Sequence, residues 1–365
     1  MERAYRYRLY PNTEQREHIE RHFGAVRWVY NYGLEKKTVA YRQDKTNISC
    51  FELSAELPSL KDTEETAWLN DINAQSLQYA LRQLDNAYTK FFRKQANFPK
   101  FKSRHRSRLA FTLPQGNRID FDTGRAKFVK LGVIKVRVDR PFVGSIVKAT
   151  ISRDVDRYFV SYTVRTPEKE KKPKRVKEAT TIGIDLGLKD FIVLSTGDRV
   201  APLKALKSKS ARLAVLQRRL SRKVKGSANR NKARIRVAKC HQNIRNQRSD
   251  WLHKLTHKLT HENQVDSYAM ETLRVSNMMK NHCLAKSISD ASWGEFARQM
   301  EYKCRWYGKN LIRIGTFEPS SKMCACGIVN RKLTLGDRLW VCASCGRKND
   351  RDLVAAQNIK AFALK

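Results

Sequence analysis

The apolar positions of the chain repeat with two different periods, and the changes of period divide the sequence into segments. Residues 4–10 alternate basic and apolar side chains up to Pro11, which predicts a short strand. Asn12 and Gln15 then have the spacing of a helix-capping box, and a later apolar stripe predicts a helix over residues 76–92. From about residue 108 to 166 the period becomes two, with Gly and Pro between the runs. The first half is therefore expected to be a small β unit interrupted by helices.

A charged stretch with two prolines, residues 167–177, marks the expected boundary between the two halves. Beyond it, apolar runs predict strands at residues 180–185, 191–196, 266–270 and 311–316. Residues 204–261 have the pattern of a basic helical hairpin. The Ser292/Glu295 pair has capping-box spacing before another amphipathic helix, and a last helix is expected to begin near Asp350. The second half therefore mixes strands and helices.

The charge balance narrows the class of partner. The 365 residues include 74 Lys and Arg against 35 Asp and Glu, a net charge of +39. Such a charge favours binding to nucleic acid, because cations that neutralise phosphates release condensed counterions. A basic surface that only keeps the chain soluble, or one that contacts anionic lipid, is the lesser alternative. No apolar run approaches the roughly 18 residues of a membrane span, and the N-terminus lacks the apolar core of a signal peptide, so we expect a cytoplasmic protein.

Three acidic residues stand in well-defined contexts in the second half: Asp185, Glu271 and Asp352. Asp185 ends an apolar strand between two glycines, and Glu271 also closes an apolar run. Asp352 falls in the first turn of the last helix, where a capping role suits Asp350. Each acid alone could be a turn former, an exposed strand end or a helix-dipole acid. Their ordered occurrence favours a shared Mg²⁺ site that cuts phosphodiester bonds.

The basic hairpin and the cysteines supply two further candidate sites. The hairpin carries a run of positive side chains that repel one another and that phosphates would stabilise. This favours contact with nucleic acid over a merely solvated face. Its candidate contacts are Arg218, Arg219, Arg222, Lys223 and Lys225. Four of the eight cysteines cluster as Cys324, Cys326, Cys342 and Cys345. They predict a structural zinc site, although the first pair is one residue closer than usual and a metal-free loop is the alternative.

These motifs, in this order, resemble the TnpB (OrfB) family of insertion-sequence proteins, compact relatives of type V CRISPR nucleases. The resemblance covers essentially the whole chain. It rests on the opening Ala-Tyr-Arg-Tyr-Arg-Leu-Tyr-Pro, the Gly-Ile-Asp-Leu-Gly strand, Gln217-Arg-Arg-Leu-Ser-Arg, Ser289-Asp-Ala-Ser-Trp-Gly, Pro319-Ser-Ser-Lys, the cysteine cluster and Asp-Arg-Asp. By matching motifs, Asp185, Glu271 and Asp352 fall on the family's catalytic positions. Val354 departs from the family, which usually has Asn there, and so a supporting hydrogen bond is expected to be missing.

The resemblance implies a multidomain chain that combines the α+β and α/β fold classes. Its parts would be a wedge-type β-barrel (1–11 and 100–168), a helical recognition insert (12–99), a basic linker (169–178), a RuvC-like nuclease of RNase H fold (179–317 and 350–365, with the basic hairpin at 203–262), and an inserted zinc ribbon (318–349).

The activity that the resemblance implies is cleavage of double-stranded DNA beside a short transposon-adjacent motif, directed by a guide RNA from the end of the mobile element. Two catalytic Mg²⁺ ions and one structural Zn²⁺ are the implied cofactors, and a nucleoid-associated prokaryotic protein is the implied setting. A guide-directed repressor that does not cut, and a transposase acting directly by strand transfer on the same fold, are the alternatives. The oligomeric state stays open.

Overall fold

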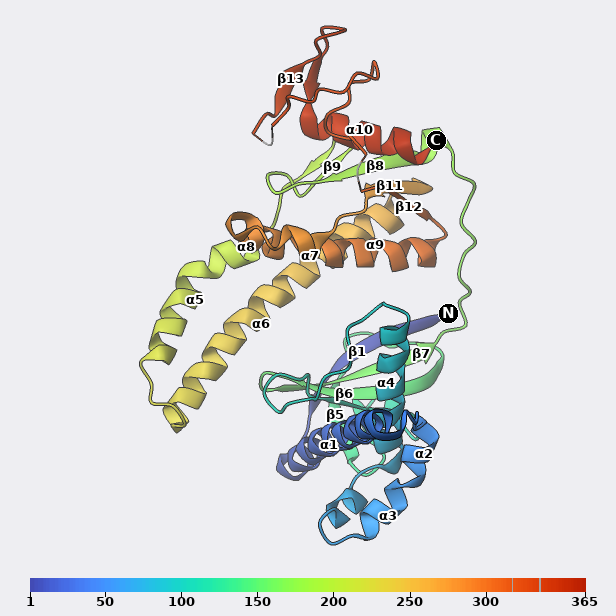
Figure 1. Ribbon diagram of the computed structural model, residues 1–365, viewed down its shortest axis with the longest axis vertical. Helices are drawn as coiled ribbons and strands as arrows, with labels where there is room; N and C mark the ends of the chain where they lie inside the picture. The colour runs from blue at the N-terminus through green and yellow to red at the C-terminus, as the bar shows by residue number, and fades with distance from the viewer. Residues whose placement is uncertain (317, 335) are drawn as a thin grey trace. The chain divides into compact units, whose positions relative to one another are not determined.

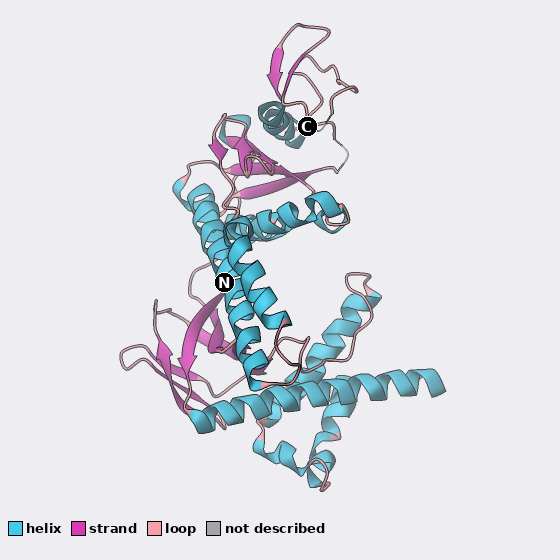
Figure 2. Cartoon of the chain, turned by 90° about the vertical axis from the view of Figure 1, so that its left-hand side faces the viewer, coloured by secondary structure: helices cyan, strands magenta, loops and turns pink. Residues whose placement is uncertain are grey.

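The computed structural model describes residues 1–316, 318–334 and 336–365, which form two compact units, residues 1–169 and 170–365 (Figure 1). Residue 317, the predicted end of a nuclease segment, lies outside the described residues. Each unit has its own sheet with helices against it (Figure 2). Among the described residues, no helix is both long and apolar enough to cross a membrane.

The first unit is built on an antiparallel sheet of seven strands in the order β2-β6-β7-β1-β5-β4-β3. The strands are β1 Glu2–Tyr10, β2 Ala110–Leu113, β3 Arg118–Asp120, β4 Arg125–Phe128, β5 Gly132–Arg137, β6 Ser145–Asp154 and β7 Arg157–Arg165. The helices are α1 Thr13–Asp44, α2 Cys50–Ala55, α3 Leu57–Asp62, the 3₁₀ helix η1 Ala67–Asp71, and α4 Ala74–Phe92. The mixed α and β class and most of these strands are as predicted, whereas closure into a wedge-type barrel remains a prediction.

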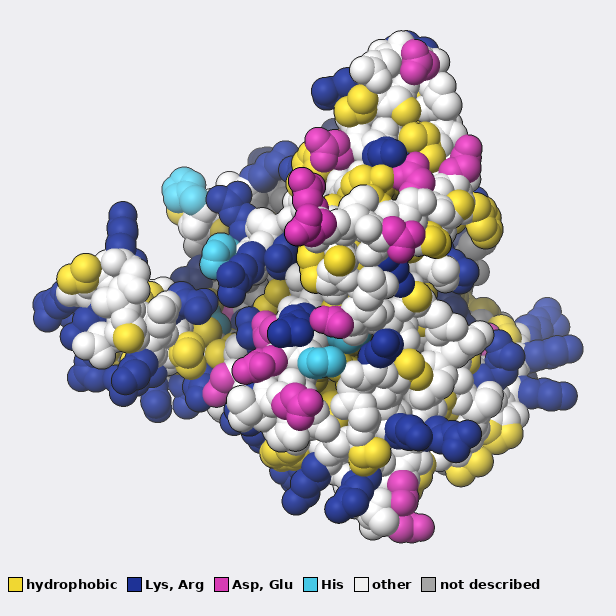
Figure 3. All heavy atoms as spheres, turned by 90° about the horizontal axis from the view of Figure 1, so that it is seen from below, with side chains coloured by type: hydrophobic (Ala, Val, Ile, Leu, Met, Phe, Trp, Pro, Cys, Tyr) yellow, Lys and Arg dark blue, Asp and Glu magenta, His cyan; other side chains and the backbone are white. Residues whose placement is uncertain are grey.

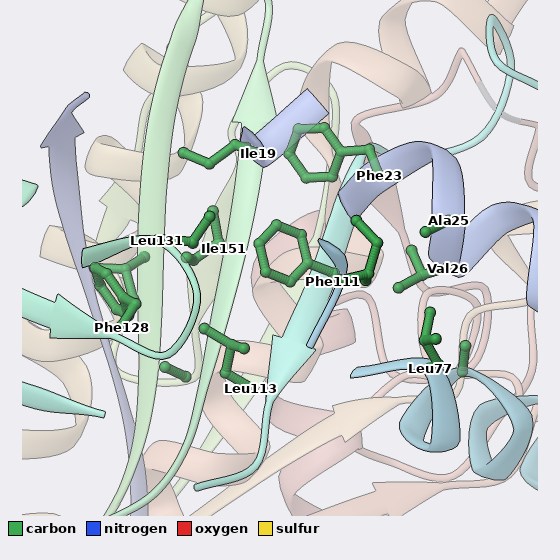
Figure 4. Close-up of a cluster of buried hydrophobic side chains, with 14 of the residues drawn as sticks. Ile19, Phe23, Ala25, Val26, Leu77, Phe111, Leu113, Phe128, Leu131 and Ile151 are labelled. Carbon is green, nitrogen blue, oxygen red and sulfur yellow. The ribbon is translucent and has the colours of Figure 1, made fainter. Parts of the chain in front are cut away.

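Helix α1 begins at the predicted capping box and packs on the sheet. The backbone N–H of Gln15 donates to Asn12 Oδ1 over 2.8 Å, and the Gln15 side chain accepts from the Asn12 N–H over 3.1 Å. Phe23 then meets Phe111 of β2 edge to face at 5.6 Å between ring centroids, and Leu77 of α4 is fully buried in the same cluster (Figure 4). The helices between β1 and β2 are thus anchored on the sheet by apolar side chains.

The second unit holds a mixed sheet in the order β10-β9-β8-β11-β12, in which β8, β11 and β12 are parallel neighbours. Its strands are β8 Thr181–Leu186, β9 Ile192–Leu194, β10 Arg199–Val200, β11 Ser267–Glu271 and β12 Asn310–Ile314, with a separate pair β13 Leu339–Val341 and β14 Lys348–Asp350. Its helices are η2 Glu178–Thr180, α5 Ala205–Ser221, α6 Ala228–His257, the π turn η3 Lys258–Glu262, α7 Val275–Met278, α8 His282–Ala291, α9 Trp293–Tyr307 and α10 Arg351–Ala363.

Helices cover both faces of this sheet. Ile184 and Met270 are buried against Phe296 of α9 and residues of α6 on one face, while Ala269 of β11 packs against Ile359 of α10 on the other. Alternate side chains of a strand point to opposite faces. The face opposite Ile184 therefore belongs to α10, which lies along β8 in Figure 1.

Gly183 permits the closest approach between α10 and β8. A Cβ atom at this position would lie 2.0 Å from the Ala356 carbonyl oxygen and 2.9 Å from the Lys360 nitrogen, both backbone atoms of α10. Only a residue without a side chain lets strand and helix meet here.

Replacing Gly183 by Ala is expected to lower the free energy of unfolding by about 2–4 kcal/mol, because backbone atoms cannot swing aside as a side chain would. Urea titration followed by circular dichroism measures the change. Gly294→Ala is the matched control, since nothing lies within 4 Å of its new methyl group, and it should change stability by less than about 1 kcal/mol. A Gly183→Ala protein as stable as the control would contradict the close contact.

One predicted cap is wrong. Ser292 has φ 57°, a left-handed conformation, and makes no side-chain cap to α9. It is the residue that ends α8 as α9 begins, and its hydroxyl instead accepts from Arg248 over 3.0 Å. Glu295 pairs with Arg298 rather than reaching back to residue 292. Tertiary contacts override the local capping pattern at this point.

Candidate active site

The parallel register of β8 and β11 brings two of the acids together. Tyr268 lies opposite Ile182 and Met270 opposite Ile184, so Glu271 follows in line with Asp185 at the carboxyl ends of adjacent strands. Asp185 lies on the same face of the sheet as Gly183, because side chains two positions apart on a strand point to the same face. The close approach of α10 to Gly183 therefore sets that helix beside Asp185.

Helix α10 brings in the third acid. Asp350 caps the helix, since its side chain accepts from the N–H groups of Asp352 and Leu353 over 3.1 and 3.0 Å, as predicted. Its carboxylate also accepts from Arg199 over 2.8 Å, which ties the helix end to β10. The Asp352 side chain is 15% exposed against 36% for Asp350, so Asp352 is the more buried of the two acids.

The acids act on one another electrostatically. Burial, and after it the negative charges of Glu271 and Asp352, raise the pKa of Asp185 from its ordinary 3.8 to about 7. Two like charges near a partly desolvated carboxyl disfavour its ionisation. A carboxyl whose pKa is raised by burial and by specific neighbouring charges is typical of functional sites.

Two contacts to the acids had not been foreseen from the sequence. Arg338 donates to both carboxylate oxygens of Asp352, over 2.8 and 3.0 Å. The hydroxyl of Ser320 donates to Glu271 Oε1. Ser320 lies in the Pro-Ser-Ser-Lys motif, so its importance had a signal, whereas nothing in the sequence marked Arg338. Both residues belong to the segment that carries the cysteines, which therefore contacts two of the three acids.

Although Val354 stands where the family usually has Asn, helix α10 carries a hydrogen-bonding Asn one turn further on. Val354 is buried and apolar. One turn further along α10, the buried Asn358 donates from its amide nitrogen to the backbone oxygens of Ser320 and Met323, over 2.7 and 2.6 Å. Asn358 thus holds the backbone of Ser320, which in turn contacts Glu271.

The four cysteines converge. Among the described residues they form the only cluster of His, Cys, Asp or Glu whose ligand atoms all lie within 4.8 Å of one another. Cys324 Sγ lies 3.6 Å from Cys345 Sγ, and Cys326 Sγ lies 3.6 Å from Cys342 Sγ. Four thiolates about 2.3 Å from one tetrahedral ion would be about 3.8 Å apart. The short spacing of the first pair therefore does not prevent a four-sulfur site.

Local backbone supports the thiols. Gly327 and Gly346 follow the two cysteine pairs with φ of 87° and 69°, so the chain turns back on itself and N–H groups point at sulfur. The N–H of Cys326 lowers the pKa of the Cys324 thiol to about 6, and the N–H groups of Cys345 and Ser344 lower the pKa of Cys342, whereas burial and the neighbouring thiols raise the pKa of Cys326 to about 11. Thiolate is the form that binds metal.

The basic hairpin is confirmed as a pair of long helices joined near Gly226. Leu213, Cys240 and Ile244 are buried between α5 and α6. The five predicted contacts, Arg218, Arg219, Arg222, Lys223 and Lys225, are all exposed. The sequence has no Asp or Glu between Arg199 and Arg248 to neutralise them. Figure 3 shows Lys and Arg side chains crowded over the projecting part at its left, where Figure 1 places the hairpin.

Replacing Arg219 by Gln is expected to weaken nucleic-acid binding about three- to fivefold near 0.15 M salt and to reduce the slope of log affinity against log salt by about 1. Arg219 lines grooves on this hairpin together with Arg236. Fluorescence anisotropy at several salt concentrations measures both quantities. Arg298→Gln is the charge-matched control, because its guanidinium is already paired with Glu295 over 2.7 Å. Equal effects of the two variants would show that only net charge matters.

Comparisons with known proteins agree with this arrangement. Residues 159–282 match the OrfB_IS605 family, described as "Probable transposase". Residues 1–46 match a family described as "Helix-turn-helix domain", although here they form β1 and the single long helix α1, and residues 293–359 match "Cas12f1-like, TNB domain".

Two curated relatives match nearly the full chain. A Streptomyces pristinaespiralis protein named "Putative RNA-guided DNA endonuclease" is 41% identical over 100% of this chain and 90% of its own length. The Escherichia coli K12 protein named "Putative RNA-guided DNA endonuclease InsQ" is 31% identical over 98% of this chain and 91% of its own length.

Among solved structures, the Cas12f1 chain in a complex with sgRNA and target DNA superposes with a TM-score of 0.60 at 14% identity, covering 99% of this chain and 98% of that one. The mixed α and β fold is therefore similar to that of the Cas12f1 chain. Identity of 41% along the whole length settles the family: the chain belongs to the TnpB (OrfB) family of insertion-sequence proteins.

Proposed function

We propose that this protein is an RNA-guided, Mg²⁺-dependent DNA endonuclease of a transposable element that cuts DNA beside a short transposon-adjacent motif. The observation that carries the proposal is that Asp185 and Glu271 end adjacent parallel strands while Asp352 lies in the first turn of α10, so that burial and then the charges of the other two acids raise the pKa of Asp185. The family and its two relatives named as RNA-guided DNA endonucleases support it.

The acidic site fits divalent cations. Its donors are carboxylate oxygens, which Mg²⁺ prefers. The oxygens of the three acids do not all lie within 4.8 Å of one another as the cysteine sulfurs do, and the cation that Asp352 contacts is the guanidinium of Arg338. When bound, Mg²⁺ would supply Lewis-acid activation of water and of the scissile phosphate.

The chain's own residues prepare the site for that chemistry. Asp185 must release the proton that its raised pKa retains before it can act as a ligand. The Ser320 hydroxyl orients one Glu271 oxygen, and Arg338 can exchange its carboxylate partner for a phosphate, which suits its planar donors. Asp185, Ser320 and Arg338 would thus arrange the charges around the reacting phosphodiester.

We assign the four cysteines to a structural Zn²⁺, with residues 318–349 as the zinc ribbon. The near-tetrahedral sulfur spacing and the lowered pKa of Cys324 support this assignment. The unit of residues 170–365 would then be the RuvC-like nuclease, since its mixed sheet carries acids at the ends of parallel strands. The sheet and helices of the first unit would be the wedge and recognition parts that read the adjacent motif, while pairing with a guide RNA reads the sequence.

The decisive experiment is to express the chain with the native DNA downstream of its gene, sequence the RNA that copurifies, and incubate the complex with Mg²⁺ and a plasmid that carries a matching target beside randomised flanks. Cleavage with one enriched flank is the expected result. Absence of bound RNA would contradict guided action.

Two other functions each have one specific observation that bears on them. Val354 in place of the family's Asn leaves open a guide-directed repressor, which would bind RNA and target but leave the plasmid intact, although the acids at all three positions argue against it. The "Probable transposase" description favours direct strand transfer, which would join labelled element ends to a second DNA molecule. The same preparation tests all three outcomes.

A further inference from the structure

The end of α4 and the loop after it combine exposed aromatic rings with charge of one sign. The sequence has no Asp or Glu between Asp85 and Asp120, while Lys and Arg recur throughout that stretch. Phe92, Phe98 and Phe101 within it are 72%, 45% and 61% exposed. Exposed phenylalanines at this density are unusual for a surface that contacts only water.

Phe92 and Phe98 line a groove in the first unit together with residues at the end of α1, among them Tyr41, Arg42 and Lys45. Its floor is a set of rings that hold one another in place. Tyr88 and Phe91 meet Phe98 edge to face, at 5.6 and 5.4 Å between ring centroids with interplanar angles of 90° and 87°.

The rim offers flat aromatic faces to solvent. Tyr41 is 59% exposed, and Phe92 lies against Tyr88 at 6.2 Å with an interplanar angle of 25°. Rings supported from behind and open in front can take a further flat ring with little loss of conformational entropy. The feature that distinguishes this groove from an ordinary core edge is that exposure.

The cations at the groove divide into two groups. Lys37 is buried and donates to Asp85 over 2.7 Å and to the Ile48 carbonyl, so it serves the fold. Arg42 and Lys45 are exposed and form no ion pair within the described residues, and Lys45 Nζ lies 5.2 Å from the Tyr41 ring centroid. These two cations are available to an anion that enters beside Tyr41.

We propose that this groove binds unpaired nucleotides, with bases stacking on Tyr41 and Phe92 and phosphates on Arg42 and Lys45. Stacking platforms edged by cations are the general means of holding single strands without regard to sequence. A second copy of the chain fits less well, because two surfaces of the same positive sign repel each other. The proposal rests on the proposed function for its nucleic-acid partner, and adds where an unpaired RNA or DNA strand is held.

The test uses the full chain and 12-nucleotide single strands, one of oligouridine RNA and one of oligothymidine DNA, with a 12-base-pair duplex for comparison. Replacing both Tyr41 and Phe92 by Ala should weaken single-strand binding about five- to fiftyfold by fluorescence anisotropy, with duplex binding changed less than about twofold. Both side chains are largely exposed, so folding should survive. The arm with the larger loss identifies the strand type.

Phe51→Ala is the matched control, because Phe51 is 76% exposed but lies on α2, outside the groove. Strands carrying 5-iodouracil should crosslink on irradiation to peptides that contain Tyr41 or Phe92. Unchanged single-strand affinity in the double variant, or crosslinks only elsewhere, would overturn the groove assignment while leaving the proposed function standing. A wild-type chain that bound neither strand nor duplex would instead remove the proposed function. A dimer in sedimentation that the double variant abolished would assign the groove to a second copy.

Discussion

Asp185→Asn is expected to lower DNA cutting by at least about a thousandfold while the guide RNA still copurifies. The amide loses the charge that a cation site needs at the centre of the three acids, and a metal-assisted phosphodiester cleavage depends on that charge. Cutting of a matched plasmid measures the loss, and the amount of copurified RNA shows whether guide binding persists. The basic hairpin is untouched by the change.

The same substitution should make the metal-free protein more stable at neutral pH. The Asp185 carboxyl has a pKa of about 7 in the folded chain against 3.8 ordinarily, so between about pH 4 and 7 the folded state holds more protons than the unfolded one. Stability of the wild type should therefore fall as pH rises through that window, by on the order of 4 kcal/mol in all. Thermal unfolding in EDTA should show the fall in the wild type and a smaller one in Asp185→Asn.

Asp198→Asn is the matched control, an exposed acid on the turn after β9 whose carboxylate, within the part of the chain that the structure describes, accepts only from the neighbouring Thr196. It should cut normally and keep the wild-type pH profile. Cutting by Asp185→Asn at the wild-type rate would contradict the proposed site. An unchanged pH profile in that variant would contradict the electrostatic coupling alone.

Cys342→Ser is expected to release zinc and to abolish most cutting as well. Structural zinc contributes apparent binding energies of about 10–16 kcal/mol in small zinc domains, and one missing thiolate removes much of that. Without the ion, residues 318–349 lose the restraint that holds Ser320 on Glu271 and Arg338 on Asp352. Zinc content by mass spectrometry, limited proteolysis between residues 318 and 349, and plasmid cutting measure the three consequences.

Cys283→Ser serves as its control, because Cys283 is exposed and lies outside the cluster. It should keep zinc, protease resistance and cutting. One zinc per chain in Cys342→Ser would show that three sulfurs suffice. Lost zinc with normal cutting would show that the ribbon does not position the acids.

Local signals in this sequence were read correctly wherever the partners lie close along the chain. The Asn12 box, the Asp350 cap and the alternation of β6 and β7 each depend on residues a few positions apart. The Ser292 box failed because Arg248 and the junction of two helices compete for that residue. Capping patterns report a preference, which tertiary contacts can outweigh.

The residues of the candidate site likewise divide into those that the sequence identifies and those that it does not. The three acids were identifiable because each ends or begins an element, and the family resemblance ordered them. Arg338 and Ser320 were not identified as their partners, since these contacts join residues 14 and 49 positions from their acids across the cysteine-bearing segment. The spacing of Cys324 and Cys326 left a metal-free loop as an alternative, because a spacing rule takes no account of the backbone turn at Gly327, whose φ is 87°.

The order of the acids along the chain has a consequence for biosynthesis. Because Asp352 enters only with α10, a ribosome that has completed the basic hairpin and the cysteine segment still holds a nascent chain without its third carboxylate. The proposed site is therefore incomplete until the last helix has been made. Docking of α10 on Gly183, in a strand made much earlier, is then the step that brings the three acids together.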